Sequence, residues 1–423
     1  MPTTPMTSTK PVAPTAPMAL STPLAPAADN PIFAVAARAE ALRARGADVI
    51  TLAAGEPQAA TSAVVVEAAV AAVRDPATHH YGPAQGHPEL RALVAARLSE
   101  DTELPWTEGD IQIALGAKHA LFLAAQALIG PGDEVLVAAP GWPGHAEVVT
   151  AAGGVPVPVE TDHAFRISPD ALDRRRTPRT RAVILSSPGN PTGAVHPESR
   201  LRGIADWARR HGIWVIGDDI YRAFDHTGTY RSVLRVAPDL RARTIVVGGV
   251  SKEHAMTGWR VGWLAAPPEI VASARLHVSR TITHVPTVNQ RAALAALNDA
   301  DTPADAARDY RRRRNLLVEA LNAIDGIDCP LPDGGMFAFP DVSDLLGDRG
   351  WTSSADLATW LLDTAHLAVV PGEAFNAPGR IRLCFAVDDR TLLTAIDRLR
   401  TALGTTPTEA TYDIDAPNPE VAR

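Results

Sequence analysis

Lysine is rare in this chain, and one lysine stands where an amine could do chemistry. The 423 residues include 40 lysines and arginines together, and the lysines among them are Lys10, Lys118 and Lys252. An arginine cannot replace an amine that must lose its proton and attack a carbonyl, because its guanidinium stays charged. A lysine can do so once burial and nearby cations lower its pKa. Lys252, within the segment 251–263, is therefore predicted to be a Schiff-base lysine.

Several other side chains of useful chemistry occur in short motifs. Asp218-Asp219-Ile220-Tyr221 offers a carboxylate and a phenol, and 187–193 is a Pro/Gly-rich segment that contains Asn190. That segment is also compatible with an ordinary turn. Gly116-Ala117-Lys118 precedes an apolar helical stretch, and the backbone N–H groups at such a helix start favour phosphate.

The elements that must position these residues alternate between strands and helices. Apolar, β-rich runs occupy 135–138, 182–185, 213–216 and 244–247, and a helix-length segment separates each pair. This alternation predicts a parallel sheet that is covered on both faces. Ligands of such sheets bind at the carboxyl ends of the strands. The residues that follow those ends are Trp142, Asn190, Asp218, Tyr221, Ser251 and Lys252.

The length of the chain suggests two domains with terminal extensions. A long helix is predicted to begin near Asp305, and the mixed segments after it predict a smaller α+β domain. The predicted organisation is a disordered arm at 1–28, a segment at 29–58 that packs with the small domain, a large domain at 59–300, the small domain at 301–404 and a flexible tail at 405–423.

Composition excludes several classes of protein. A formal charge of −8 and a pI near 5.9 argue against a nucleic-acid scaffold. No apolar run is long enough for a membrane helix, and the N-terminus lacks the pattern of a signal peptide. Cys329 and Cys384 need not pair, so a cytoplasmic protein with reduced thiols is expected. No metal site is predicted.

Six motifs in order, from about Asn30 to Leu403, resemble those of the fold-type I pyridoxal-phosphate (PLP) enzymes of the class I/II aminotransferase family. They are Gly55-Glu56-Pro57, Tyr81-Gly82-Pro83 with Gly86, the segment 187–193, Asp218-Asp219-Ile220-Tyr221, the segment 251–263, and Arg380-Ile381-Arg382-Leu383. The resemblance implies the α/β fold of PLP-dependent transferases of type I. Such a fold has a large domain with a mostly parallel seven-stranded sheet flanked by helices, and a smaller α+β domain.

The resemblance also implies roles for individual residues around pyridoxal 5′-phosphate. Lys252 would carry the cofactor as an aldimine, Asp218 would keep the pyridine nitrogen protonated, and Asn190 with Tyr221 would bond the ring oxygen. Trp142 would lie flat against the ring, although a core tryptophan is the alternative. The phosphate ligands implied are Gly116, Ala117, Lys118, Ser251 and Arg260. Gly249 stands where many relatives have a further hydroxyl residue.

Substrate contacts follow from the same resemblance. Arg382 would clamp the substrate α-carboxylate, and it is preferred to Arg380, which is expected to be exposed. Gly55 and Asn190 would also face the substrate, and Lys118 resembles a lysine that reaches the distal carboxylate of acidic substrates. Ile32 replaces the hydroxyl residue that accompanies that lysine, which weakens the expectation of an acidic substrate. The residues of the segment 58–62 differ from those that family members often have there. The difference either opens the pocket toward a larger substrate or reflects sequence drift in a surface loop.

The resemblance further implies a homodimer in which Tyr81 reaches the phosphate of the neighbouring subunit. The expected reaction moves an amino group between an L-amino acid and a 2-oxo acid. The alternative keeps PLP but performs elimination, replacement, cyclisation or oxidation on an amino acid such as S-adenosylmethionine or arginine. A non-catalytic PLP-binding sensor is a further alternative, disfavoured because an arm of about 28 residues is too short for a DNA-binding domain.

Overall fold

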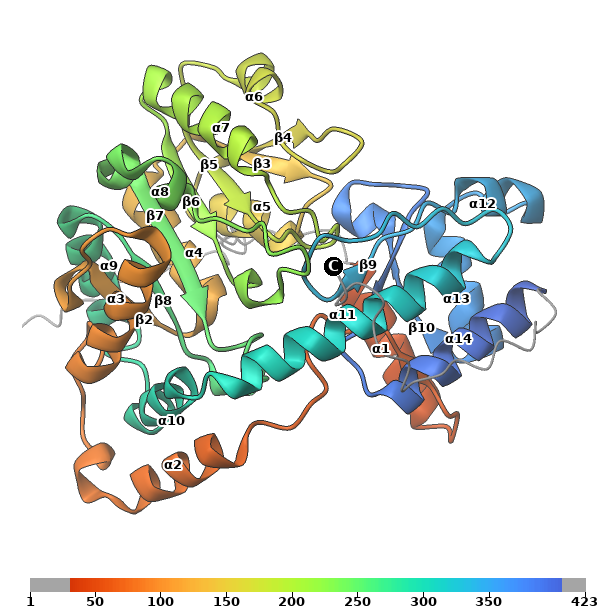
Figure 1. Cartoon of the computed structure of the whole chain (residues 1–423), viewed down its shortest axis with the longest axis horizontal. Coiled ribbons are helices and arrows are strands. Elements are labelled where there is room, and N and C mark those ends of the chain that lie inside the picture. Colours follow the sequence, from red (N-terminus) through yellow and green to blue (C-terminus); the bar gives the residue numbers. More distant parts are fainter. Residues whose placement is uncertain (1–30, 405–423) are drawn as a thin grey trace, which may run out of the picture.

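The computed structural model describes residues 31–404, which form a large sheet with helices on both faces and a second group of smaller elements beside it (Figure 1). This architecture confirms the predicted fold class. The predicted arm at 1–28 and the predicted tail at 405–423 lie outside the described residues.

The large sheet has seven strands in the order β2-β8-β7-β6-β5-β3-β4. Their bounds are β2 (Ile111–Ala114), β3 (Glu134–Ala139), β4 (Val155–Glu160), β5 (Thr180–Ser186), β6 (Trp214–Asp218), β7 (Thr244–Gly249) and β8 (Gly262–Ala265). Strands β3 to β7 pair in parallel, and β8 runs antiparallel to both β2 and β7. The four apolar runs of the sequence are therefore the four central parallel strands.

Burial on both faces explains why these strands are continuously apolar. Val183 and Val215 belong to one hydrophobic cluster, whereas their chain neighbours Ile184 and Ile216 belong to another. Successive strand residues point to opposite faces of a sheet, so each strand feeds two separate cores. Helices cover both faces (Figure 1). The helices of this part are α2 (Ala63–Arg74), α3 (Pro88–Thr102), α4 (Gly116–Leu128), α5 (Pro143–Ala151), α6 (Pro169–Arg175), α7 (Glu198–His211), α8 (Val233–Val236), α9 (Pro268–Thr281) and α10 (Thr287–Asn298).

The second group combines the start of the described chain with its end, as the red and blue segments of Figure 1 show. Its elements are α1 (Pro31–Arg43), β1 (Ile50–Thr51), α11 (Asp301–Asn322), β9 (Phe337–Ala338), α12 (Ser343–Arg349), α13 (Ser354–Ala365), β10 (Leu367–Ala368), β11 (Val370–Pro371), β12 (Ile381–Cys384) and α14 (Asp389–Leu403). Strand β1 pairs in parallel with β10, and β11, β12 and β9 form an antiparallel sheet. The boundaries at 58/59 and 300/301 between domains stay a prediction.

The long helix α11 begins at Asp301, four residues before the predicted start near Asp305. Asp299 explains the difference, because its Oδ1 accepts hydrogen bonds from the backbone N–H groups of Asp301 (3.1 Å) and Thr302 (3.2 Å). A carboxylate that accepts from the first N–H groups of a helix stabilises the start there. Pro303 falls in the first turn, where its missing N–H costs nothing.

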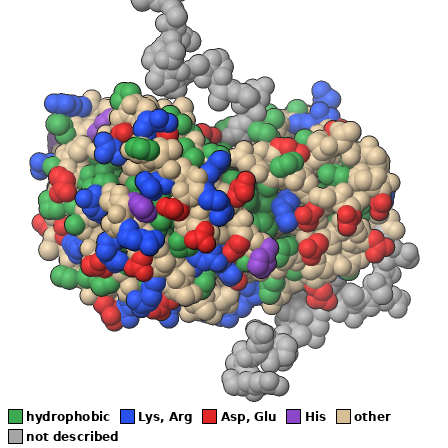
Figure 2. Space-filling view, turned by 90° about the horizontal axis from the view of Figure 1, so that it is seen from above, with side chains coloured by type: hydrophobic (Ala, Val, Ile, Leu, Met, Phe, Trp, Pro, Cys, Tyr) green, Lys and Arg blue, Asp and Glu red, His purple; other side chains and the backbone are tan. Residues whose placement is uncertain are grey.

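Charged side chains of both signs are interspersed over the face shown in Figure 2. Within residues 31–404, no helix is long and apolar enough to cross a membrane.

Candidate functional site

A cavity of ≈ 1080 Å³ lies at the carboxyl ends of the central strands, and Lys252, Asp218, Asn190 and Arg382 all line it. The wall also includes residues of α1 and of the segment 53–61. Elements from both groups of the fold therefore enclose the space in which the candidate residues meet.

Lys252 lies in the turn that follows β7 and is partly buried. Its Nζ donates a hydrogen bond of 2.6 Å to the carbonyl oxygen of Gly55. Burial, which disfavours the ammonium form, lowers the pKa of Lys252 to about 8. The amine therefore loses its proton far more readily than an exposed lysine, which is what a nucleophile or a general base requires.

Asp218 ends β6 and is almost fully buried. His145 Nε2 donates a hydrogen bond of 2.8 Å to Asp218 Oδ2, whereas the buried Oδ1 has no partner. A buried carboxylate oxygen without a donor is costly, so the site is suited to a ligand that brings a polar N–H to Oδ1. The protonated pyridine nitrogen of PLP is such a group, and this geometry fits the cofactor that the sequence implied.

His145 is a residue that the sequence interpretation missed. It lies on α5, three residues after Trp142, which precedes the helix, and its ring meets the Trp142 ring edge to face at 5.2 Å and 87°. Gly144 leaves the room that this tryptophan ring occupies, since a Cβ there would lie 2.4 Å from ring atoms. The helical spacing of 142 and 145 was the available signal, but a sequence does not show that position 145 faces Asp218.

Arg382, on β12, is held in place by contacts to both groups of the fold. Its Nη1 donates to Asn190 Oδ1 at 3.0 Å, and its Nη2 donates to the carbonyl oxygen of Ala53 at 2.7 Å. Its guanidinium lies over the rings of Phe337 (4.4 Å) and Phe375 (5.0 Å), and its buried Nε has no partner. Arg382 is 2% exposed, so its positive charge is largely removed from water. A buried charge of this kind is stabilised by a negatively charged partner.

Arg380 is engaged elsewhere. It forms an ion pair of 2.9 Å with Asp341, and it does not line the cavity. The structure therefore brings Arg382, and not Arg380, to the other candidates.

Tyr221 follows β6 and shares a side-chain hydrogen bond with Asn190. Burial raises the pKa of Tyr221, so the phenol keeps its proton and can donate it in a hydrogen bond. Asn190 thus touches both Tyr221 and Arg382, which places the three groups on one side of the cavity.

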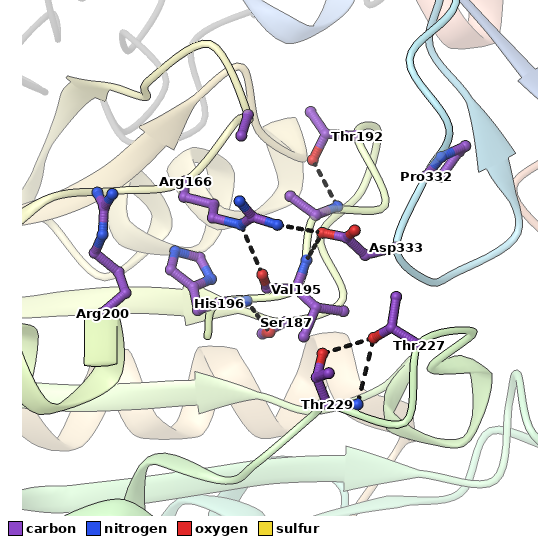
Figure 3. A network of polar contacts seen from close by, with 12 residues as sticks. Arg166, Ser187, Thr192, Val195, His196, Arg200, Thr227, Thr229, Pro332 and Asp333 are labelled. Atoms are coloured by element: carbon purple, nitrogen blue, oxygen red, sulfur yellow. Dashed lines mark hydrogen bonds and ion pairs between the residues drawn. The ribbon is translucent and has the colours of Figure 1, made fainter. Parts of the chain in front are cut away.

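The loop that carries Asn190 is fastened to the segment 330–335 by the polar network shown in Figure 3. Arg166 pairs with Asp333 at 2.7 Å and donates to the carbonyl oxygen of Val195 at 2.9 Å. Asp333 also accepts from the backbone N–H of Val195 at 3.1 Å. These contacts fix the position of the loop between the two groups of elements.

A second region of the cavity is built around the start of α4. Gly116 has φ +77°, and a Cβ at this position would lie 2.7 Å from Arg260 Nη2. Arg260 donates to the carbonyl oxygens of Leu115 (3.2 Å) and Thr257 (2.9 Å), which points its guanidinium along the helix N-terminus. With Ala117 and Ser251 also lining the cavity, this corner offers backbone N–H groups, a hydroxyl and a cation to a phosphate.

Gly249 cannot supply the hydroxyl that many relatives have at its position. A Cβ there would lie 3.0 Å from the carbonyl oxygen of Val261 and 3.1 Å from the Cα of Gly262. Glycine at 249 therefore leaves room for the close approach of β8.

Lys118 takes a different partner from those expected. Its Nζ forms an ion pair of 3.0 Å with Glu147 Oε2 and lies 5.0 Å from the centroid of the Trp142 ring. Lys118 lines the cavity, but its charge is already matched within this chain.

Tyr81 does not line the cavity of its own chain. It is 87% exposed, and its ring touches His284 edge to face at 6.0 Å. The structure of one chain therefore leaves Tyr81 apart from the other candidates.

The departing segment 58–62 lies against the lysine turn. Thr61 Oγ1 donates to the carbonyl oxygen of Ala255 (2.9 Å), and Trp259 Nε1 donates to Thr61 Oγ1 (3.1 Å). Gln58 and Ala59 line the cavity, so the segment forms part of the site wall.

Comparison with known proteins gives consistent findings. The family model "Aminotransferase class I and II" matches residues 47–399. An aspartate aminotransferase of Streptomyces avermitilis is 39% identical over 383 residues, which are 89% of this chain and 94% of that protein. The crystal structure of the aspartate aminotransferase from Rhizobium meliloti has a TM-score of 0.86 at 32% identity, covering 92% of this chain and 99% of that one. Aspartate aminotransferase from Thermus thermophilus with maleate has a TM-score of 0.83 at 35% identity, covering 91% and 100%.

Proposed function

The chain belongs to the class I and II aminotransferase family, whose chemistry implies pyridoxal phosphate, and we propose that Lys252 holds this cofactor and that the residues around it carry out the amino transfer. The enzyme moves an amino group between an L-amino acid and a 2-oxo acid. The observation that carries the proposal is the buried Asp218, whose Oδ1 lacks a partner while Lys252 lines the same cavity.

The residues assigned to the cofactor each offer a matching group. When bound, pyridoxal phosphate supplies an aldehyde carbon and a ring that withdraws electrons from the substrate Cα. Asp218 would hold the proton of the ring nitrogen, with His145 fixing the orientation of the carboxylate. Asn190 and Tyr221 would donate to the ring oxygen, and Trp142 would cover the ring. The groups that would hold the phosphate are the N–H groups of Gly116 and Ala117, the Ser251 hydroxyl and Arg260.

Arg382 would bind the α-carboxylate of the amino acid. Its rigid fork suits a carboxylate, and the rings of Phe337 and Phe375 keep water away from the contact. The contacts to Asn190 and Ala53 fix the guanidinium before substrate arrives, so little conformational freedom is lost on binding.

Lys252 would move the proton. With a pKa of about 8, its amine can take a proton from the substrate Cα and give it to a neighbouring atom. One group would thus act first as general base and then as general acid. The carbonyl oxygen of Gly55 holds Nζ in position.

We propose that the active unit is a homodimer. Helix α2 buries Val65 against the fold, but it exposes Val66 (39%), Val70 (36%) and Val73 (56%) along one face, and Tyr81 nearby in sequence is 87% exposed. A row of exposed apolar side chains on one helix supports an interface. In such a dimer Tyr81 would reach the cavity of the partner, as the family resemblance implies.

The proposal is tested by trapping the cofactor. Borohydride reduction of the purified holoenzyme, followed by peptide mass analysis, should place one reduced cofactor on the peptide that contains Lys252. The Lys252→Ala variant should carry none and lose turnover, whereas Lys118→Ala, which changes the other lysine of the cavity, should still be labelled at Lys252. Turnover retained by Lys252→Ala would refute the proposed mechanism.

A further inference from the structure

Lys118 and Glu147 form a matched pair of opposite charges at the wall of the cavity. The distance from Lys118 Nζ to Glu147 Oε2 is 3.0 Å, and both side chains are about half exposed (48% and 46%). Both residues line the cavity, beside Trp142. A substrate carboxylate that approached Lys118 would also approach Glu147, whose negative charge offsets much of the attraction.

The remaining charged residues of the wall do not supply another cation for a second carboxylate. Apart from the groups assigned to the cofactor and the α-carboxylate, the charged lining residues are Glu40, Arg43, Glu56, Lys118 and Glu147. Their formal sum is one negative charge, from three acids and two bases. Arg43 pairs with Glu40 and donates to the carbonyl oxygen of Val49 at 3.0 Å. The net charge of these lining residues therefore disfavours binding of an anionic substrate side chain.

Apolar side chains also line this cavity. Ile32, Phe33 and Ala36 face the cavity from α1, and Leu121 and Pro143 line it from α4 and α5. Phe33 is 69% exposed, so much of its surface is open to a ligand. Such a surface gains stability when an apolar ligand covers it.

We propose that the amino acid substrate carries a large, uncharged, apolar side chain, and that Glu147 selects against a side-chain carboxylate by neutralising Lys118. This inference rests on the proposed function, because it takes Arg382 as the site of the α-carboxylate. Phe33, which lines the same cavity from α1, supplies an apolar contact.

Binding of substrate-like acids that lack an amino group tests the inference without turnover. Isothermal titration of the holoenzyme with 3-phenylpropanoate, a monocarboxylate, and with maleate, a dicarboxylate, compares the two side-chain types. The wild-type enzyme should bind 3-phenylpropanoate at least tenfold more tightly, a difference of about 1.4 kcal/mol. Tighter binding of maleate by the wild type would overturn the inference.

Two variants assign the effect to residues. Glu147→Gln keeps the shape of the side chain but removes its charge, so maleate should bind about tenfold more tightly while 3-phenylpropanoate is unchanged. Phe33→Ala should weaken 3-phenylpropanoate about tenfold and leave maleate unchanged. Glu198→Gln, which removes an acid far from the cavity on α7, is the matched control. Maleate affinity unchanged by Glu147→Gln would refute the role of Glu147.

A panel of amino donors separates failure of this inference from failure of the proposed function. Phenylalanine, leucine and methionine should release their 2-oxo acids with a higher kcat/KM than aspartate or glutamate. If aspartate or glutamate is the best donor, the inference is wrong and the proposed function stands. If the holoenzyme converts no amino acid although the binding pattern is as expected, the proposed function is wrong and the account of the pocket stands.

Discussion

Replacing Arg382 with alanine should remove substrate binding while leaving the cofactor in place. Arg382 is 2% exposed, and its guanidinium is fixed by hydrogen bonds of 3.0 Å to Asn190 Oδ1 and 2.7 Å to the carbonyl oxygen of Ala53. A forked, desolvated contact to a carboxylate is lost as a whole when the side chain is truncated. Losing one partner of a buried charge pair costs about 2–5 kcal/mol. The expected fall in kcat/KM is therefore roughly 30-fold to several thousand-fold.

The assay compares two variants of neighbouring arginines. Arg380→Ala removes a cation that pairs with Asp341 outside the cavity, so its kcat/KM should stay within about twofold of the wild type. For both variants, the cofactor content after gel filtration is read from absorbance, and steady-state rates give kcat/KM. Loss of cofactor from Arg382→Ala, with kcat/KM per bound cofactor unchanged, would show that Arg382 serves the cofactor instead of the substrate.

Three further predictions rest on how buried or exposed single residues are. In the protein freed of cofactor, the rate of Lys252 acylation should rise with pH around a midpoint near 8, because burial lowers the pKa of its ammonium to about 8; a midpoint near 10 would contradict this. Burial likewise lowers the pKa of His196 to about 4, so the unfolded state alone gains a proton as pH falls below 6.5. Between pH 7 and pH 5, the free energy of unfolding should therefore drop by about 2 kcal/mol more in the wild type than in His196→Asn. Urea unfolding at the two pH values measures this difference, and equal drops in the two proteins would contradict the prediction. Val73→Asp on the exposed face of α2 should convert the protein to monomers in analytical ultracentrifugation, whereas a dimer unaffected by this charge would place the interface elsewhere.

The strands of the large sheet could be predicted because a strand that is buried on both faces is a continuous apolar run in the sequence. Runs such as 182–185 are apolar without alternation, and turn residues bound them. The residues after these runs, Asn190, Asp218 and Lys252, lie in one cavity because the carboxyl ends of parallel strands share one edge. The choice of Arg382 over Arg380 also followed from strand position, since Arg380 precedes β12 and Arg382 lies within it.

The pairwise contacts of the site could not be predicted in the same way. His145 and Asp218 are 73 residues apart, and only the packing of α5 against the sheet brings Nε2 within 2.8 Å of the carboxylate. The partner of Lys118 depends on the rotation of α5 as well, because Glu147 must face α4. The predicted start of α11 near Asp305 missed a local signal, because the carboxylate of Asp299 accepts from the N–H groups of Asp301 and Thr302 and so stabilises a start at Asp301.

The most direct test of the central claim measures a single turnover without an acceptor. Holoenzyme is mixed with one amino acid at a time, and the released 2-oxo acid and ammonia are quantified against the concentration of sites labelled at Lys252. An aminotransferase should release one equivalent of 2-oxo acid per site, release no ammonia, and resume only when a second 2-oxo acid is added. Continued product release with ammonia and no acceptor would contradict the account and indicate elimination or oxidation instead.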